Sequence, residues 1–243
     1  MYDKIKNVKK IDFESENLIY KKTNYWAKFL SQAILLVCSF VAVFIIIFSI
    51  IFVSAPVKGI SMQPTLNAEG DVKHDMVYIN KVLPYGYEDI VVVERPTNSI
   101  DVNYIIKRVV GMPGDKIKIM QNQADKKVYV YRNGYKVDEP YLSQEAKDTG
   151  MLTTLVQFIE YYNSVLRHPD DYSDILFDSN GWLVLQEDQI FVLGDNRGFS
   201  EDSSALGPFY KNKVTGRVDF ILPYGTIPFY YFLEYYTGIS IKY

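Results

Sequence analysis

The chain has 243 residues, of which 48% are hydrophobic and 23% charged; this is the composition of a folded protein and excludes a disordered one. Its 26 basic and 29 acidic residues leave a net charge of −3, so no basic surplus indicates nucleic acid, and no such partner is expected. One Cys excludes an intramolecular disulfide and a cysteine-rich zinc site, and two His leave little for a histidine-based metal site. We therefore expect no metal, no cofactor and, for covalent chemistry, a hydroxyl nucleophile.

A long uncharged run follows the N-terminal segment. It covers 29 residues, from 29 to 57, whereas about 20 apolar residues suffice for a helix to cross the hydrocarbon core of a bilayer. A cleavable leader is the alternative, but its apolar core would be shorter, and Pro56 would directly follow the small residues at which cleavage would occur. The sequence predicts a retained transmembrane helix at 29–56, with the lipid bilayer as a partner.

Basic residues before this run predict its orientation. Residues 1–28 contain seven Lys and four acidic residues, and short lysine-rich segments stay on the cytoplasmic side of a membrane. We therefore expect a single-pass protein of the cell membrane with a cytoplasmic tail at 1–28. The remainder, 57–243, is then the extracytoplasmic domain.

The segment after residue 57 has mostly β patterns. Alternating or β-branched runs, separated by Gly, Pro and Asn signals, predict strands. These runs lie at 76–82, 90–93, 104–110, 116–120, 127–132, 182–185, 189–193 and 214–222. Asn133 and Gly134 predict a two-residue hairpin turn, and helical spacing at 144–168 marks a small insertion, taken as 140–181. The predicted fold class is mainly β: a largely antiparallel sheet with a small helical cap insertion, preceded by one transmembrane helix.

Ser61 and Lys107 are the first candidates for chemistry. A serine needs a base to become a nucleophile, and both imidazoles, His74 and His168, lie in loop-like, charged or proline-containing surroundings. Lys107 interrupts an apolar strand pattern, next to Arg108. Because neighbours in a strand point to opposite faces, one of the two can enter an apolar site while the other reaches solvent or a carboxylate. A buried ammonium has a lowered pKa, which makes the neutral amine available as a base.

Three segments together resemble the main sequence boxes of bacterial type I signal peptidases, in their Gram-positive form. They read GISMQPTL at 59–66, KRVVGMPGD at 107–115 and GDNRGFSEDS at 194–203. Their order, their spacing and the preceding anchor also fit. The resemblance covers about 30–120 and 189–222 and leaves out the tail, the insertion and the C-terminus.

The resemblance implies a membrane-anchored serine endopeptidase that removes signal peptides from exported preproteins. It makes Ser61 the nucleophile, Lys107 the general base and Ser200 the serine that orients the lysine. The Ser61 N–H becomes one oxyanion donor, and Gly59 stands where some members carry a serine that supplies a second. Such an enzyme has preprotein signal peptides as partners, and a contact with the secretion machinery is left open.

Three further positions match structural polar residues of the family. These are Asp195, expected to pair with Arg108, then Arg197, and finally Asp202. In the family, Asp202 faces an arginine two positions later; here that position is Ser204, so this ion pair is absent.

Signal peptides present small residues before the cleavage site, so shallow apolar pockets are expected near Ser61 and Lys107. The candidate substrate-binding residues are Met62, Met76, Val77 and Ile105, with core packing as the alternative for each. Two other functions are weighed against the peptidase: a self-cleaving Ser-Lys repressor-type protease, which would lack an anchor, and a catalytically silent pilus-assembly or secretion chaperone, which would not need both Ser61 and Lys107.

Overall fold

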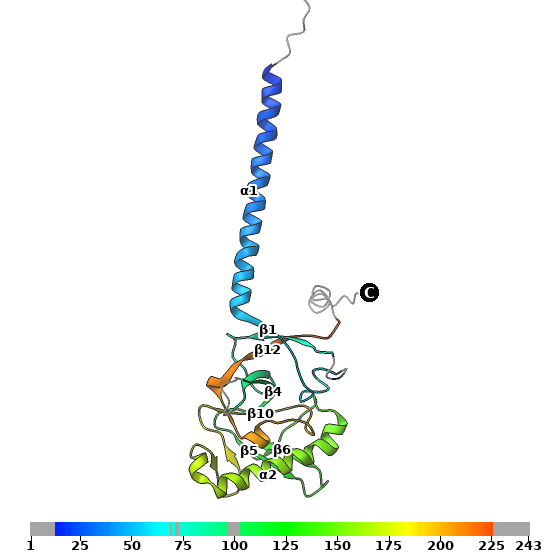
Figure 1. Cartoon of the computed structure of the whole chain (residues 1–243), viewed down its shortest axis with the longest axis vertical. Coiled ribbons are helices and arrows are strands. Elements are labelled where there is room, and N and C mark those ends of the chain that lie inside the picture. Colours follow the sequence, from blue (N-terminus) through cyan, green and yellow to red (C-terminus); the bar gives the residue numbers. More distant parts are fainter. Residues whose placement is uncertain (1–12, 69, 71–72, 97–102, 226–243) are drawn as a thin grey trace, which may run out of the picture. The chain divides into compact units, whose positions relative to one another are not determined.

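The computed structural model describes residues 13–68, 70, 73–96 and 103–225, with side chains from residue 25 onward (Figure 1). The chain divides into two compact units, Met1–Ile50 and Ile51–Tyr243. The first 12 residues of the predicted tail lie outside the described part of the chain.

The first unit is built on one long helix, α1 (Phe13–Ile51). Its segment Tyr25–Ile51 has 27 residues and a mean hydropathy of 3.2, and none of it is buried within the protein. At 1.5 Å per residue this segment is about 40 Å long, more than the roughly 30 Å of a hydrocarbon core. Length and exposed apolar surface agree with the single membrane anchor predicted from the sequence.

The predicted end of the helix is wrong by five residues. The helix stops at Ile51, and Phe52–Pro56 form strand β1, which pairs antiparallel with β2 (Met76–Asn80). Pairing with β2 gives the backbone of this β-branched segment partners that a helix would otherwise supply. Pro56 is tolerated because β1 lies at the edge of its sheet, where a missing N–H costs nothing.

The second unit contains two antiparallel sheets. The larger one has seven strands in the order β1-β2-β12-β3-β4-β10-β11. Its remaining strands are β3 (Ile90–Glu94), β4 (Tyr104–Gly111), β10 (Gln189–Leu193), β11 (Phe209–Tyr210) and β12 (Val214–Leu222). Strands β4 and β10 therefore lie side by side although they are far apart in the chain, and the segment that follows β10 is brought next to Lys107 on β4.

The smaller sheet has five strands in the order β7-β6-β5-β9-β8. They are β5 (Lys116–Gln121), β6 (Val128–Arg132), β7 (Tyr135–Lys136), β8 (Leu176–Phe177) and β9 (Leu183–Val184). The predicted turn joins β6 to β7, with positive φ at Asn133 (54°) and Gly134 (90°). Both angles are those of the hairpin turn that the Asn-Gly pair favours.

The helical insertion covers this smaller sheet. A five-residue π-helix, η1 (Ala146–Gly150), runs directly into α2 (Met151–Arg167) and is followed by a short turn of 3-10 helix, η2 (Pro169–Tyr172). Figure 1 shows α2, in yellow-green, beside β5 and β6. Phe158 of α2 packs in one core cluster with Ile117, Val130 and Phe191, so the insertion is part of the packed domain.

The fold class predicted from the sequence is confirmed: an antiparallel β domain with a small helical insertion follows an apolar N-terminal helix. Two other core clusters support the larger sheet. One of them, with Val57, Met62, Leu66 and Val77 among its members, anchors the turn that carries Ser61.

Candidate active site

Ser61 lies in the turn that links β1 to β2, and its backbone is held by Asn196 from the segment that follows β10. The Ser61 carbonyl accepts a hydrogen bond from the Asn196 N–H at 3.0 Å. The Asn196 side chain donates to the Ile60 carbonyl at 3.1 Å. Asn196 thus fixes two consecutive peptide groups at the candidate nucleophile.

Asn67 holds the same turn from within. It is fully buried with a φ of 54°, and its Nδ2 donates to the carbonyls of Val57 at 2.9 Å and Gly59 at 3.0 Å. Its backbone N–H donates to the Asp75 carboxylate, and the Asp75 N–H donates back to Asn67 Oδ1. The two ends of the loop are therefore tied together, and Ser61 lies on a braced segment.

Lys107 approaches Ser61 from strand β4. Its Nζ lies 2.7 Å from Ser61 Oγ and donates to the Ile106 carbonyl at 2.9 Å. The residue is 2% exposed. Burial lowers the pKa of Lys107 to about 8, although the Asp202 and Asp195 carboxylates raise it. Loss of hydration outweighs these carboxylates because none of them lies within ion-pair distance of Nζ in the described part of the chain.

Arg108 points to the other face of β4, as the strand pattern requires. Its guanidinium forms two hydrogen bonds with the Asp195 carboxylate, of 2.9 and 2.5 Å, which is the pairing predicted from the sequence. Asp195 also accepts a hydrogen bond from the Thr65 hydroxyl. The Tyr141 ring lies 4.0 Å from the guanidinium carbon. This cluster links β4, the segment after β10 and the loop that carries Ser61.

Arg197 is completely buried and pairs with the buried Glu139. Burial alone would lower the pKa of Arg197. The Glu139 carboxylate acts in the opposite direction, and the pKa of Arg197 is raised above its ordinary value, so the guanidinium stays charged. Its Nε donates to the Gly194 carbonyl at 3.0 Å. Any side chain at Gly194 would collide with the Ser61 carbonyl oxygen and the Ser200 hydroxyl. Arg197 therefore holds a glycine that lies directly behind the candidate nucleophile, Ser61.

A cavity of about 210 Å³ opens beside the two candidate catalytic residues. Ser61, Met62, Ile105 and Lys107 are among its lining residues, and most of the others are apolar. The lining also includes Ala55, Pro56, Val57, Lys58, Gly59, Ile79, Val92, Tyr104 and Ile106. Within the described residues, no three His, Cys, Asp or Glu side chains gather as they would around a metal ion.

A half-buried serine beside a lysine with a lowered pKa, next to a largely apolar cavity, is an arrangement for acyl transfer. The family model of signal peptidase, peptidase S26, matches residues 26–223. Signal peptidase I S of Bacillus subtilis is 33% identical over 214 residues, which cover 86% of this chain and 94% of that protein. The chain belongs to the signal peptidase I family.

A second relative agrees with this assignment. Signal peptidase I of Streptococcus pneumoniae is 31% identical over 176 residues, covering 68% of this chain and 79% of that protein. A crystal structure of a signal peptidase I from Enterococcus faecalis matches with 20% identity and a TM-score of 0.33, covering 56% of this chain and 98% of that one. Signal peptidase I is a serine endopeptidase, and signal peptidases act on preprotein signal peptides. An enzyme is therefore favoured over the silent chaperone and the soluble repressor-type protease.

Ser200 and Asp202 differ from what the family pattern suggests. Ser200 is buried near Ser61, yet its hydroxyl has no hydrogen-bond partner among the described residues. Asp202 accepts from the Gly194 N–H at 2.9 Å and from the Ser204 hydroxyl at 2.8 Å. Ser204 thus serves Asp202 as a neutral donor at the position where the family has an arginine.

The predicted substrate-binding residues fall into two groups. Met62 and Ile105 line the cavity beside Ser61, whereas Met76 and Val77 do not. Val77 is completely buried in the core cluster that contains Met62, so the structure gives it a packing role. Met76 pairs with Pro56 at the end of β1. The strand pattern that suggested these positions shows which residues are apolar, but it does not distinguish residues that line a cavity from residues that pack in the core.

The sequence analysis assigned no role to Asn67, Glu139, Tyr141 or Asn196, all of which contact other residues of the site. Asn196 lies within the third box, so its position was visible but its role was not. Glu139 and Tyr141 lie just before or at the start of the insertion, where no motif marks them. Their contacts with Arg197 and Arg108 arise from the packing of the smaller sheet against the larger one, which no local pattern records.

Proposed function

We propose that Ser61 is the nucleophile and Lys107 the general base with which this signal peptidase cleaves preproteins. The observation that carries the proposal is the 2.7 Å separation of Ser61 Oγ and Lys107 Nζ. This is within the range expected for a nucleophile and its base. With a pKa of about 8, about one lysine in ten is neutral at pH 7, against fewer than one in a thousand for an exposed lysine.

The reaction follows from these positions. Neutral Lys107 takes the proton of Ser61 Oγ as this oxygen attacks the scissile carbonyl carbon. When the tetrahedral intermediate collapses, the C–N bond breaks and the lysine gives its proton to the leaving amine, which becomes the N-terminus of the mature protein. A water molecule, deprotonated by the Lys107 amine, then attacks the ester carbon. The bond from this carbon to Ser61 Oγ breaks, Lys107 returns the proton to Oγ, and the signal peptide leaves with a new carboxylate.

The Ser61 N–H is the proposed donor to the oxyanion. Among the described residues it donates to no acceptor, so it is available for the oxygen that becomes negative in the transition state. Gly59 has a φ of 84°, a conformation that side chains rarely adopt. A serine at this position would strain the turn, so we propose that a second donor does not come from residue 59.

The cavity beside Ser61 is the proposed site for the residues that precede the cleavage point. Met62 and Ile105 contribute to a wall that is largely apolar, and its volume of about 210 Å³ suits the small side chains found at the ends of signal peptides. Strand β1 lies at a sheet edge, and an extended peptide can add to an edge strand.

The proposed location is the cell membrane, with residues 1–28 in the cytoplasm, residues 29–56 including the span and the domain at 57–243 outside. The lysine-rich tail before the apolar segment supports this orientation, and contact with the secretion machinery would bring preproteins to the enzyme. Protease added to intact cells is expected to digest the segment after Pro56 and spare the tail. A protected domain would overturn the orientation.

The test of the catalytic assignment is cleavage of a preprotein by purified full-length protein. Ser61→Ala and Lys107→Arg are expected to abolish cleavage, the second because a guanidinium does not give up its proton at working pH. Ser173→Ala and Lys116→Arg change exposed residues away from the site and serve as matched controls. Turnover by Lys107→Arg near that of its control would remove Lys107 as the base.

Ser200 remains a proposed positioning residue. Its buried hydroxyl has no partner within the described part of the chain and could turn toward Lys107 once a substrate excludes water. Ser200→Ala is therefore expected to slow cleavage less than Lys107→Arg does, since it removes orientation but leaves the base in place. Loss of activity as complete as in Ser61→Ala would contradict this supporting role.

A further inference from the structure

A second cavity, of about 370 Å³, adjoins the turn that carries Ser61. The two cavities share this turn but use different residues of it. Gly59, Ser61 and Met62 line the first cavity, whereas Ile60 and Gln63 line the second. The two cavities therefore adjoin the same turn, with Ser61 in the lining of the first and its neighbour Ile60 in the lining of the second.

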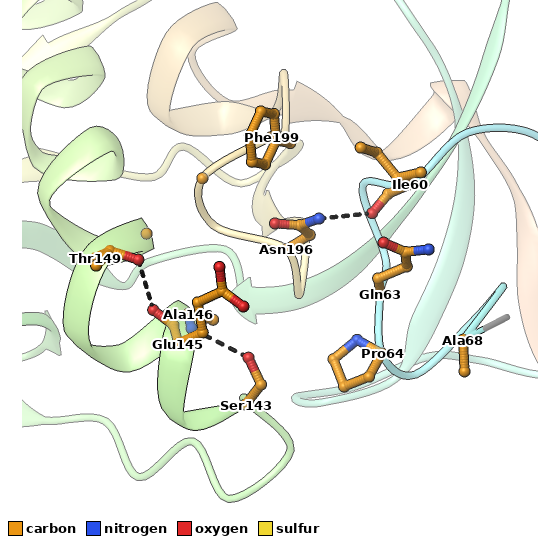
Figure 2. A pocket seen from close by; sticks show the side chains of 12 residues that line it. Ile60, Gln63, Pro64, Ala68, Ser143, Glu145, Ala146, Thr149, Asn196 and Phe199 are labelled. Carbon is orange, nitrogen blue, oxygen red and sulfur yellow. Dashed lines mark hydrogen bonds between the residues drawn. The ribbon is translucent and has the colours of Figure 1, made fainter. Parts of the chain in front are cut away.

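The far wall of the second cavity comes from the helical insertion. It includes Ser143, Glu145 and three residues of η1, and it faces Asn196, Gly198 and Phe199 from the segment after β10. Figure 2 shows the two walls with the Ser61 turn beside them.

The helical insertion is in direct contact with the segment that follows β10, through Arg197 and Gly198. A Cβ at Gly150 would come within 2.8 Å of the Gly198 backbone nitrogen, so the two backbones are in close contact. The Thr154 hydroxyl lies within hydrogen-bond distance of the carbonyls of Gly150, at 3.1 Å, and of Arg197, at 3.3 Å. These contacts hold Glu145 at a set position relative to Asn196, which in turn holds Ser61.

Glu145 gives the cavity its charge. It is the one charged side chain among the described residues that line it. Its carboxylate has no hydrogen-bond or ion-pair partner within the described part of the chain. Figure 2 shows the carboxylate directed into the space between η1 and Asn196. Amides from Gln63 and Asn196 and hydroxyls from Ser143 and Thr149 add four polar side chains to a lining whose other residues are apolar. Phe199, 70% exposed, is one of these apolar residues.

We infer that this cavity binds the residues of the preprotein that follow the scissile bond, and that Glu145 selects a basic side chain there. The inference rests on the proposed function, because it takes Ser61 as the point of cleavage. The residues that line each cavity indicate which side of the scissile bond it binds. The first cavity is smaller and has mostly apolar lining residues, so it suits the end of a signal peptide. The second is larger and mixes apolar residues with five polar side chains, of which Glu145 is the acidic one, so it suits the start of a mature, water-soluble chain.

The expected preference is small but measurable. Ion pairs between exposed side chains contribute up to about 1 kcal/mol, which corresponds to roughly a two- to fivefold change in kcat/KM. The substrate series keeps one signal peptide and places Lys, Gln or Glu, one at a time, at each of the first five positions after the cleavage site. At one or two of these positions the wild-type enzyme is expected to cleave the Lys substrate faster than the Gln substrate.

The ratio of rates for Lys and Gln substrates is measured within each variant, so a change in absolute rate does not affect it. Glu145→Gln is expected to bring the ratio to one, and Glu145→Lys to reverse the preference in favour of Glu substrates. Glu160→Gln removes an exposed carboxylate of α2 that does not line the cavity, so it should keep the wild-type ratio. The wild-type preference should also shrink as the salt concentration rises.

Two results would overturn the inference. One is a wild-type enzyme that cleaves all substrates at rates independent of the residues after the cut. The other is a preference that Glu145→Gln leaves intact. In both cases the signal peptide is still removed, so the proposed function stands. Failure of the wild-type enzyme to cleave any of these substrates would instead contradict the proposed function.

Discussion

Two opposing effects determine the charge of Lys107. Carboxylates of Asp202, Asp195 and Glu201 favour the ammonium, whereas burial favours the neutral amine, and burial prevails with a pKa of about 8. The carboxylates are occupied elsewhere. Asp195 pairs with Arg108, Glu201 pairs with Arg95, and Asp202 accepts hydrogen bonds from the backbone of Gly194. None of them forms an ion pair with the lysine, so each acts only at a distance.

The first prediction concerns the dependence of cleavage on pH. The value of kcat/KM for a soluble peptide should rise about tenfold per pH unit below pH 7 and level off above about 8, since it reports the pKa of the base in the free enzyme. The measurement is a series of initial rates in buffers of constant ionic strength. A profile that is flat between pH 6 and 9 would show that no group with this pKa acts as the base.

The second prediction is that Lys107→Met is inactive but more stable than the wild-type protein. Below pH 8 the lysine is protonated in both the folded and the unfolded state, and the folded state carries the full cost of a buried ammonium. As the pH rises from about 8 to 10.5, the folded state loses its proton first and this cost disappears. Removing the lysine should therefore stabilise the fold at neutral pH by about 3 kcal/mol.

Thermal unfolding followed by circular dichroism in detergent measures this effect. A gain of that size corresponds to about 6–12 °C in melting temperature for a domain of this length. The difference between Lys107→Met and wild type should narrow above pH 8 and vanish near 10.5. A variant that is less stable than wild type at pH 7 would contradict the idea that burying the Lys107 ammonium lowers the stability of the fold.

At the scale of elements, the segment after β10 connects the parts of the site. Asp195 binds Arg108 of β4 and Thr65 of the loop that carries Ser61. Asn196 binds the peptide groups beside Ser61, and Arg197 binds Glu139. Three consecutive residues thus hold three separate parts of the fold. Their order in the chain explains why such a short motif can define a site.

The third prediction tests this connection through Asp195→Asn. The Asp195 side chain is fully buried and the Arg108 side chain only 10% exposed, so removing the carboxylate leaves a buried guanidinium without its counterion. Losing one partner of a buried pair costs about 3–5 kcal/mol. Glu94→Gln breaks the pair between Glu94 and Lys213, whose side chains are 30% and 47% exposed, and should cost less than about 1 kcal/mol.

Urea unfolding of both variants measures the two free energies. Equal losses would mean that the pair between Arg108 and Asp195 contributes no more than a surface contact. Cleavage should also fall in Asp195→Asn, because the neighbouring Asn196 holds the Ser61 backbone, whereas Glu94→Gln should cleave as wild type does.

Most strands were predictable because their residues alternate or are β-branched and have turn signals at both ends. The strand predicted at 214–222 agrees with β12 (Val214–Leu222) at both ends. Strand β1 was missed because Phe52–Pro56 continues an apolar helix without any charge or glycine, and only pairing with β2 separates the two. The two-residue strands β8 and β11 depend entirely on neighbours distant in the chain and carry no pattern of their own.

The candidate site was predictable where chemistry and position coincide in a short motif. Ser61, Lys107 and the pair of Arg108 with Asp195 follow from the boxes and from strand alternation. Asn67 and Glu139 were not predictable, because a buried Asn or Glu looks in sequence like an ordinary loop residue. The structure reveals their roles: Asn67 donates to the carbonyls of Val57 and Gly59, and Glu139 accepts from the guanidinium of Arg197.

At the scale of the whole molecule, strand β1 contributes both to the larger sheet and to the cavity beside Ser61. It directly follows the apolar helix in sequence, forms the edge of the seven-stranded sheet and supplies Ala55 and Pro56 to the cavity beside Ser61. The position at which a soluble form of the enzyme begins should therefore decide whether it is active, even though the domain boundary expected from the sequence lies after this strand.

The last prediction compares two truncated chains. A chain that begins at Ile51 keeps the whole second unit and should fold and cleave signal peptides in solution. A chain that begins at Val57 lacks β1, which exposes the edge of β2 and removes Ala55 and Pro56 from the cavity. It should aggregate more readily and cleave at least about tenfold more slowly, mainly through weaker substrate binding. Peptide cleavage and light scattering, both in the same detergent, measure the two effects. Equal activity of the two chains would show that β1 contributes neither a stable sheet edge nor a wall for the substrate.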